Sequence, residues 1–188
     1  MNFEDTKEEA AFRAQVRSWL EANAKPKTAD TLKARAALSE PEALKKAKEW
    51  QAKRAAAGYA RITWPKEAGG MGGTPIQSVI YGQEESKFDV PSGFFEIGLG
   101  MCIPTVMQYT SAEHKARYVK PALYGQEIWC QLFSEPAAGS DVAGIRTKAE
   151  RDGGDWIVNG QKIWTSGAHY SDYGILLTRT DPSVPKHK

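Results

Sequence analysis

Apolar side chains follow a helical period over the first two thirds of the chain. The clearest stretch predicts an amphipathic helix over about residues 6–25, with an apolar face made of Phe12, Val16, Trp19 and Leu20. Weaker periodicity, together with start and stop signals, predicts further helices over about residues 28–38, 40–57, 75–87, 92–109 and 111–123. The pattern therefore predicts an all-helical region that ends near residue 125.

Capping residues and loop residues divide this helical region. Thr6 or its neighbour Asp5 can cap the first helix, Ser39 begins a capping box, and Gly58 is a natural left-handed stop. Residues 61–75 contain four glycines and two prolines. They predict a plain loop rather than a phosphate-binding one, because no Gly-Lys-Ser/Thr follows them.

Beyond about residue 125 the apolar period changes to the alternation of β-strands. Strands are predicted over about residues 126–133, 145–151, 156–158, 163–164 and 173–180. Asp152-Gly153-Gly154 predicts one turn, and Asn159-Gly160 is the stronger hairpin signal because both residues tolerate a positive φ. We therefore expect a return strand that begins at Ile163-Trp164 and an antiparallel sheet.

The two regions predict an α+β multidomain fold. We expect residues 1–125 to form an N-terminal all-helical domain and residues 126–188 to form the first strands of an antiparallel, β-barrel-like middle domain. Because residues 163–164 are only the beginning of a return strand, at most four full strands fit before Lys188, which would leave an open edge and an uncovered face. We therefore expect this β domain to be incomplete, with the chain cut inside it.

Composition excludes several classes of protein. The 25 Lys and Arg residues and 23 Asp and Glu residues give a net charge of +2, so no basic surface for nucleic acid is expected. No apolar run approaches the roughly 20 residues that span a bilayer. The acidic start lacks the apolar stretch of a signal peptide. We expect a cytoplasmic protein with no membrane span.

The cysteines and histidines predict neither a metal site nor a nucleophile. Cys102 and Cys130 are expected to be buried apolar residues, because no histidine lies near them in the sequence. The three histidines, His114, His169 and His187, are far apart and form none of the spaced pairs that bind metals.

Two polar segments of the β region carry the chemistry that the sequence offers. Residues 133–141, Phe-Ser-Glu-Pro-Ala-Ala-Gly-Ser-Asp, combine small residues with hydroxyls, which suits an anion or the polar edge of a heterocycle. Residues 161–167, Gln-Lys-Ile-Trp-Thr-Ser-Gly, place an aromatic face beside two hydroxyls. Taken alone, each segment has a plainer interpretation, as a turn rich in small residues and as an edge-strand tryptophan with exposed hydroxyls.

Together, four motifs resemble those of the acyl-CoA dehydrogenase family. Residues 134–141 resemble its Ser/Thr-Glu-Pro-x-x-Gly-Ser-Asp signature, and residues 159–166, Asn-Gly-Gln-Lys-Ile-Trp-Thr-Ser, resemble its second flavin segment. Residues 64–70 resemble its Pro-x-x-x-Gly-Gly loop, and residues 110–118 resemble its Glu-His-Lys helix. The motifs occur in the family's order and cover essentially the whole chain.

The resemblance implies a flavoenzyme. Family members have N-terminal helical, middle β and C-terminal helical domains, bind FAD and usually assemble as homotetramers. They convert an acyl-CoA thioester to a trans-2-enoyl-CoA: a glutamate takes the α-proton, the β-hydrogen leaves as hydride to the flavin, and an electron-transfer flavoprotein takes the electrons. That glutamate lies in the C-terminal domain, so no residue of this chain is assigned as catalytic. We expect residues 1–188 alone to bind FAD weakly and to be inactive.

By resemblance, the cofactor would contact both polar segments. The implied flavin-binding residues are Gln131, Leu132, Phe133, Ser134, Gly139, Ser140, Trp164, Thr165 and Ser166. Trp164 would lie against the isoalloxazine face, and Ser134 would hydrogen-bond its pyrimidine part. Ser166, where many relatives carry threonine, would hydrogen-bond the flavin N5. Ser140 and Glu96 would contact the acyl-CoA substrate.

Several assignments stay open at this stage. We expect Glu135 to fix the loop through a salt bridge and Asp141 to form a turn, rather than to act as acid or base. The glycines of the helix over 92–109 either widen an acyl pocket or only allow helix packing. An acyl-CoA oxidase or flavin monooxygenase of the same fold, or a non-catalytic partner subunit in a hetero-oligomer, are the alternative functions.

Overall fold

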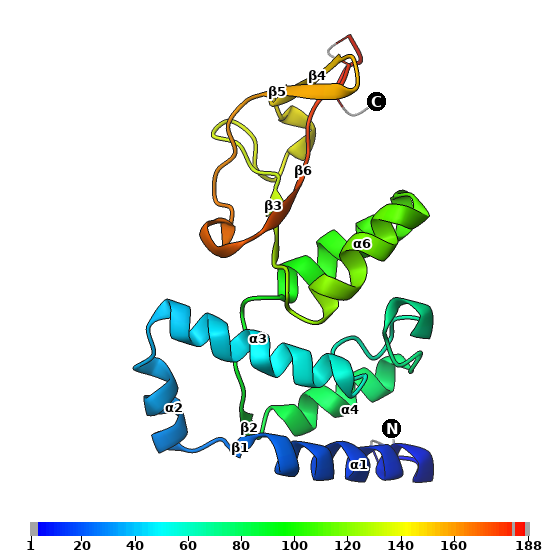
Figure 1. The fold of residues 1–188 in the computed structure, drawn as a ribbon, viewed down its shortest axis with the longest axis vertical. Coiled ribbons are helices and arrows are strands. Elements are labelled where there is room, and N and C mark those ends of the chain that lie inside the picture. Colours follow the sequence, from blue (N-terminus) through cyan, green and yellow to red (C-terminus); the bar gives the residue numbers. More distant parts are fainter. Residues whose placement is uncertain (1–3, 182, 187–188) are drawn as a thin grey trace.

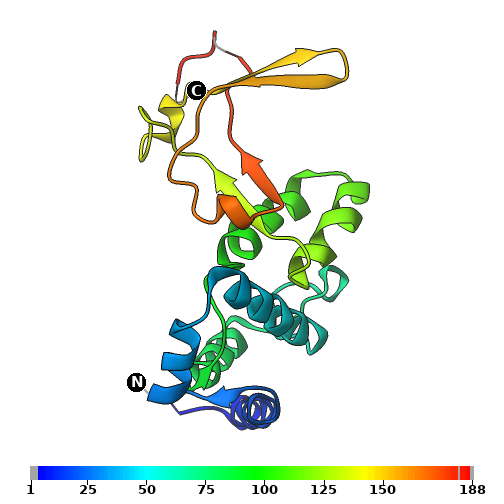
Figure 2. The same cartoon turned by 60° about the vertical axis from the view of Figure 1, so that its left-hand side comes forward.

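The computed structural model describes residues 4–181 and 183–186. The chain forms an elongated molecule with a helical part at one end and a β part at the other (Figures 1 and 2). Its α-helices are α1 (Lys7–Asn23), α2 (Ala29–Ala36), α3 (Glu40–Ala56), α4 (Pro75–Glu85), α5 (Ile103–Tyr109) and α6 (Ala112–Leu123). Its strands are β1 (Lys25–Pro26), β2 (Phe88–Asp89), β3 (Trp129–Leu132), β4 (Lys148–Asp152), β5 (Asp155–Asn159) and β6 (Tyr173–Leu176).

The helices begin and end largely where their capping residues predict. The Thr6 side chain accepts a hydrogen bond from the Glu9 amide, which begins α1, and Ser39 and Glu42 form the capping box of α3. Gly58 and Gly125 adopt φ values of +81° and +71° just after α3 and α6, the left-handed conformation that glycine adopts at low cost. The helical expectation for these segments is therefore confirmed.

One hydrophobic core lies between α1, α4 and one face of α3. The apolar face predicted for α1 is buried or half-buried in it, and the core's buried residues are Phe12, Val16, Leu20, Trp50, Tyr59, Ile62, Ile80, Tyr81 and Phe88. At its edge the fully buried Glu84 carboxylate pairs with Arg17 at 3.0 Å, Lys87 at 2.8 Å and Arg13 at 3.1 Å. The hydrogen bonds from Arg17, Lys87 and Arg13 outweigh the opposing effect of burial and lower the pKa of Glu84 to about 2.

A second core joins the helical part to the β part. The opposite face of α3 contributes Ala47 and Ala55, and α6 contributes Val119, Ala122 and Leu123. Ile128 and Trp129, at the start of β3, complete this side of the core. Helix α3 therefore lies between two cores (Figure 1). The buried side-chain amide of Gln51 on α3 donates to the Leu123 carbonyl at 2.7 Å. This hydrogen bond links α3 to the end of α6.

The helix predicted over 92–109 begins later than expected and is not uniform. Residues before 96 form bends, and a π-helical turn, η2 (Gly98–Cys102), precedes α5. A Cβ at Gly98 would lie 3.1 Å from the Trp129 Cβ, so this glycine permits close packing of the helix against β3. Short 3₁₀ turns also occur at η1 (Lys66–Ala68), η3 (Val142–Gly144) and η4 (Ala168–Tyr170).

Backbone hydrogen bonds within the glycine-rich loop over 61–75 hold it together. The amides of Gly70, Gly72 and Gly73 donate to the carbonyls of Pro65, Trp64 and Ile62. Because these donors are engaged inside the loop, they form no phosphate cradle, and the interpretation as a plain loop is confirmed.

The β part departs from the predicted antiparallel sheet. Strands β3 and β6 pair in parallel, with Trp129 opposite Tyr173, whereas β4 and β5 form an antiparallel hairpin. A parallel pair needs a long connection. The intervening residues supply it, and they carry both polar segments.

The predicted hairpin turn at Asn159-Gly160 is wrong. The turn predicted at Asp152-Gly153-Gly154 is confirmed: it joins β4 to β5, and Gly153 has a φ of +59°. Strand β5 ends at Asn159, and no return strand forms at Ile163-Trp164. A Cβ at Gly160 would lie 2.6 Å from the Thr147 Cα. This glycine therefore serves a close backbone approach, not a turn.

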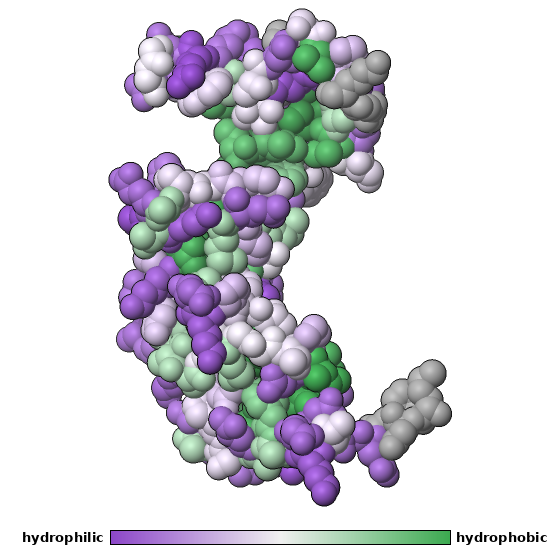
Figure 3. Space-filling view, turned by 90° about the vertical axis from the view of Figure 1, so that its right-hand side faces the viewer, coloured by the Kyte–Doolittle hydropathy of each residue, from purple (hydrophilic) through white to green (hydrophobic). Residues whose placement is uncertain are grey.

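Much of the β part's apolar surface is uncovered. Three successive residues of β5, Trp156, Ile157 and Val158, are 52%, 50% and 44% exposed. Figure 3 shows apolar surface gathered on the β part. None of the helices in residues 4–181 and 183–186 is both long and apolar enough to cross a membrane.

Candidate functional site

The two polar segments predicted from the sequence lie side by side. The Ile163 amide donates to the Ser134 carbonyl at 2.9 Å. The Lys162 ammonium donates to the Phe133 carbonyl, also at 2.9 Å. The parallel β3–β6 pair sets this geometry, because residues 133–141 leave the end of β3 while residues 161–167 lie on the way to β6.

A buried carboxylate holds the two segments together. Glu135, 6% exposed, accepts hydrogen bonds from the amides of Arg146 at 2.6 Å and Thr147 at 2.9 Å, and from the Lys162 ammonium at 2.8 Å. Burial alone would raise the pKa of Glu135, but these donors lower it to about 2. Glu135 therefore stays ionised and fixes the loop, as expected, and has no proton to exchange near neutral pH.

The hydroxyl groups of the two segments, unlike the Glu135 carboxylate, are not used in hydrogen bonds between the described residues. Ser134, Ser140, Thr165 and Ser166 make no side-chain hydrogen bond to any residue that the structure describes. Ser134 and Thr165 are half-buried, whereas Ser140 and Ser166 are exposed. Four hydroxyls on two joined segments are thus available to a ligand.

Trp164 is the most unusual residue of the site. Its side chain is 87% exposed, and its φ of +57° is the only positive value among the non-glycine residues of the described chain. Bulky residues rarely adopt this conformation, which costs roughly 1–2 kcal/mol. An outlier of this kind beside free hydroxyls points to a functional constraint on the indole.

The remaining residues implied at the cofactor lie in β3 and in the loop that follows it. Gln131 and Leu132 are half-buried in β3, opposite Ile175 and Leu176 of β6, and Phe133 follows them, also half-buried. A Cβ built on Gly139 would meet no atom within 4 Å, so the loop has open space there.

Glu96 lies at the start of the helix that leads into η2. Its exposed carboxylate accepts hydrogen bonds from the amides of Gly93 and Phe95, both at 3.0 Å. The neighbouring Phe94 packs edge-on against Tyr170 of η4, with ring centroids 5.2 Å apart. Through this contact the helix start reaches the segment that follows Trp164, while a substrate contact by Glu96 stays a prediction.

Sequence reasoning missed the part played by Lys162. The residue stood inside a recognised motif, but no role was assigned to it. The sequence did contain a signal for this ion pair. Residues 161–167 have one lysine and residues 133–141 have one glutamate, and these two charges can pair if the segments are adjacent. Asp141 forms the expected turn, with its carbonyl accepting from the Gly144 amide, and its carboxylate lies 2.8 Å from the Lys186 ammonium.

The described residues contain no group of three or more His, Cys, Asp or Glu side chains that could hold a metal ion. His187 lies outside the described residues. Cys102 and Cys130 are buried, and burial raises the pKa of the Cys102 thiol to about 11, which keeps it protonated and unreactive.

These features fit a flat, polar-edged cofactor such as a flavin. The uncovered indole offers a stacking face, the free hydroxyls offer directional hydrogen bonds, and the small residues of the loop let backbone groups come close. The ion pair between Glu135 and Lys162 would hold this arrangement before the cofactor arrives.

Models of known protein families match both the helical part and the β part of the chain. Residues 6–126 match the N-terminal domain of acyl-CoA dehydrogenases, and residues 130–188 match their middle domain. The acyl-CoA dehydrogenase IpdE1 of Mycobacterium tuberculosis is 36% identical over 176 residues, which are 94% of this chain and 46% of the relative.

Solved structures show the same fold. In the ChsE4-ChsE5 complex of Mycobacterium tuberculosis, one chain superposes with a TM-score of 0.76 at 30% identity, over 97% of this chain and 45% of that one. A glutaryl-CoA dehydrogenase of Mycobacterium smegmatis, in complex with FADH2, superposes with a TM-score of 0.67 at 23% identity, over 94% of this chain and 44% of that one.

The chain spans about half the length of these relatives. Family models nevertheless cover its helical part and its β part in the family's order. The fold, the two joined segments and the matches lead to one assignment: the chain belongs to the acyl-CoA dehydrogenase family.

Proposed function

We propose that this chain supplies one wall of the flavin site in an enzyme that oxidises an acyl-CoA thioester to a trans-2-enoyl-CoA. The observation that carries the proposal is the joining of residues 133–141 to residues 161–167 through Lys162 and Ile163. The hydroxyl groups of both segments and the exposed Trp164 indole thereby lie on one surface.

Within this proposal the chain's residues bind and orient the cofactor. FAD, when bound, supplies the acceptor for the hydride that leaves the β-carbon. Trp164 stacks on the ring, Ser134 hydrogen-bonds its pyrimidine part, and Ser166 donates to N5. A fixed donor at this position stabilises the electron density that arrives with the hydride.

The substrate and the base complete the proposal. Ser140 and Glu96 contact the acyl-CoA, and the glutamate that takes the α-proton lies outside residues 1–188. The chain alone therefore binds FAD weakly and does not turn over substrate. The length and branching of the acyl group stay unassigned.

The proposed organisation follows the family. Residues 1–125 form the helical domain and residues 126–188 belong to the middle β domain. The whole protein acts in the cytoplasm, assembles as a homotetramer or hetero-oligomer, and passes electrons to an electron-transfer flavoprotein.

The test is anaerobic reduction of bound FAD by a panel of acyl-CoA thioesters in the whole protein. At least one thioester should bleach the flavin absorbance and yield the trans-2-enoyl-CoA. Ser166→Ala should slow this reduction by about 100-fold, the effect of losing one donor to developing charge, and Ser166→Thr should restore it. Absence of reduction by every thioester would contradict the proposal, and peroxide release in air would assign the oxidase alternative.

A further inference from the structure

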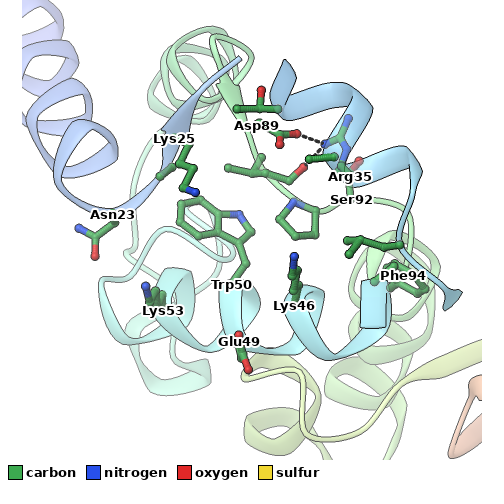
Figure 4. Close-up of a pocket in the computed structure, with 17 residues that line it drawn as sticks. Asn23, Lys25, Arg35, Lys46, Glu49, Trp50, Lys53, Asp89, Ser92 and Phe94 are labelled. Atoms are coloured by element: carbon green, nitrogen blue, oxygen red, sulfur yellow. Dashed lines mark hydrogen bonds and ion pairs between the residues drawn. The ribbon is translucent and has the colours of Figure 1, made fainter. Parts of the chain in front are cut away.

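A cavity of about 750 Å³ lies in the helical part, between α2, α3 and residues 89–94 (Figure 4). Its volume falls within the roughly 300–1,000 Å³ that is typical of small-molecule sites. None of its lining residues belongs to residues 133–141 or 161–167. A ligand in this cavity would therefore not occupy the proposed flavin wall.

Trp50 forms the centre of an apolar floor. Trp50 is 6% exposed and lines the cavity, and its indole N–H already donates to Glu85 at 3.3 Å, so this polar atom is not left to a ligand. Leu38, Val90 and Phe94 also line the cavity; Leu38 follows α2, and Val90 and Phe94 follow β2. An apolar ligand body would be removed from water on this floor.

Basic residues outnumber acidic residues in the lining of the cavity. Asp89 is paired with Arg35 at 3.0 Å, and Arg35 also donates to the Val90 carbonyl at 2.6 Å. The other acidic lining residue, Glu49, points away from Trp50 in Figure 4. The negative charges near the cavity are therefore already paired or directed elsewhere.

Three lysines of the lining have no such partner. Lys25, Lys46 and Lys53 form no salt bridge with any residue in the described parts of the chain. In Figure 4 the Lys25 ammonium points toward the Trp50 indole, and Lys46 and Lys53 rise from α3 beside it. Lys46 lies close enough to Glu42 for its charge to favour the ionised form of that carboxyl. The rim of the cavity therefore carries three lysines that form no salt bridge among the described residues, over an apolar floor.

We propose that this cavity binds an amphipathic carboxylate. The apolar body lies on Trp50, and the carboxylate lies among Lys25, Lys46 and Lys53. Arg35, which also lines the cavity, is already paired with Asp89, so the ammonium groups of the three lysines are the charges that face an anionic head, and they attract it as point charges. The proposal is independent of FAD and of the dehydrogenation proposed above.

Calorimetric titration of the purified chain with dodecanoate, kept below its micellar concentration, tests the proposal. Dodecanoate should bind with one-to-one stoichiometry, and dodecanol should bind about tenfold more weakly. Lys46→Gln combined with Lys53→Gln should weaken dodecanoate binding by about tenfold, or 1.4 kcal/mol. Lys45→Gln is the matched control, because Lys45 is exposed on α3 and does not line the cavity.

A second variant separates binding in the cavity from adsorption to surface lysines. Ala34 lines the cavity from α2 and is exposed, so Ala34→Phe fills space without changing charge. It should abolish binding while the circular dichroism spectrum stays unchanged. Absence of dodecanoate binding, or full binding in Ala34→Phe or in the double lysine variant, would overturn the proposal.

Discussion

The Lys162 ammonium lies 2.8 Å from the Glu135 carboxylate, and both side chains are more than nine-tenths buried. This pair joins segments that are 27 positions apart in the sequence. Lys162 also donates to the Phe133 carbonyl, and Glu135 also accepts from two amides, so each charge is satisfied on several sides. The pair therefore determines the geometry of the proposed flavin wall.

Removing one partner of this pair should destabilise the β part. Glu135→Gln leaves the Lys162 ammonium buried without its counter-charge, and Lys162→Met leaves the carboxylate without its cation. Each should lower the free energy of unfolding by about 3 kcal/mol, and the double variant should cost less than the sum. Urea denaturation followed by circular dichroism measures these differences.

An exposed ion pair of the β4–β5 hairpin provides the control. Lys148 lies 3.1 Å from Glu150, and the two side chains are 54% and 61% exposed. Lys148→Gln should change the free energy of unfolding by less than about 1 kcal/mol. Equal costs for Lys148→Gln and Lys162→Met would show that the buried pair does not fix the segments.

Acid should weaken the helical part through Glu84. The pKa of this carboxylate is lowered from 4.5 to about 2 in the folded chain, so the folded state favours its ionised form. Its contribution to stability is present in full above about pH 4.5 and is lost as the pH falls toward 2. The difference in the free energy of unfolding between the wild type and Glu84→Gln should shrink over this range, and a constant difference would contradict the assignment.

Two glycines with left-handed backbones should respond differently to alanine. Gly153, with a φ of +59°, has no atom within 4 Å of a built Cβ, so Gly153→Ala should cost about 1 kcal/mol from backbone strain. At Gly125, with a φ of +71°, the Cβ would lie 2.9 Å from Gln51 Cγ and 3.1 Å from Phe95 Cζ. Gly125→Ala should therefore cost about 1–3 kcal/mol more. Equal melting temperatures for the two variants would contradict this account of the second core.

The helical part could be predicted well because its signals are local. The capping box at Thr6, the left-handed stop at Gly58 and the apolar face of α1 each act within one or two turns. The start of the helix predicted at residue 92 could not be placed from local signals. Gly98 packs closely against Trp129, and the sequence near Gly98 does not reveal this tertiary contact.

The β part shows where such reasoning fails. The predicted turn at Asp152-Gly153-Gly154 is present, but the second predicted turn, at Asn159-Gly160, is not. Gly160 is required where the backbone approaches Thr147. The parallel pairing of β3 with β6 depends on contacts across about forty residues, which no local pattern contains. The motifs predict that the two segments serve one site, and the structure places them side by side. The pair between Glu135 and Lys162 became visible only in the structure.

The central proposal is that residues 133–141 and 161–167 form one flavin-binding surface around Trp164. An equilibrium titration of residues 1–188 with FAD, followed by quenching of flavin fluorescence, tests it most directly. We expect weak but saturable binding that becomes about tenfold weaker in Trp164→Ala, because ring stacking contributes about 0.5–1.5 kcal/mol beyond the area it buries. Binding of FAD that is unchanged in Trp164→Ala, or no binding by either protein, would contradict the proposal.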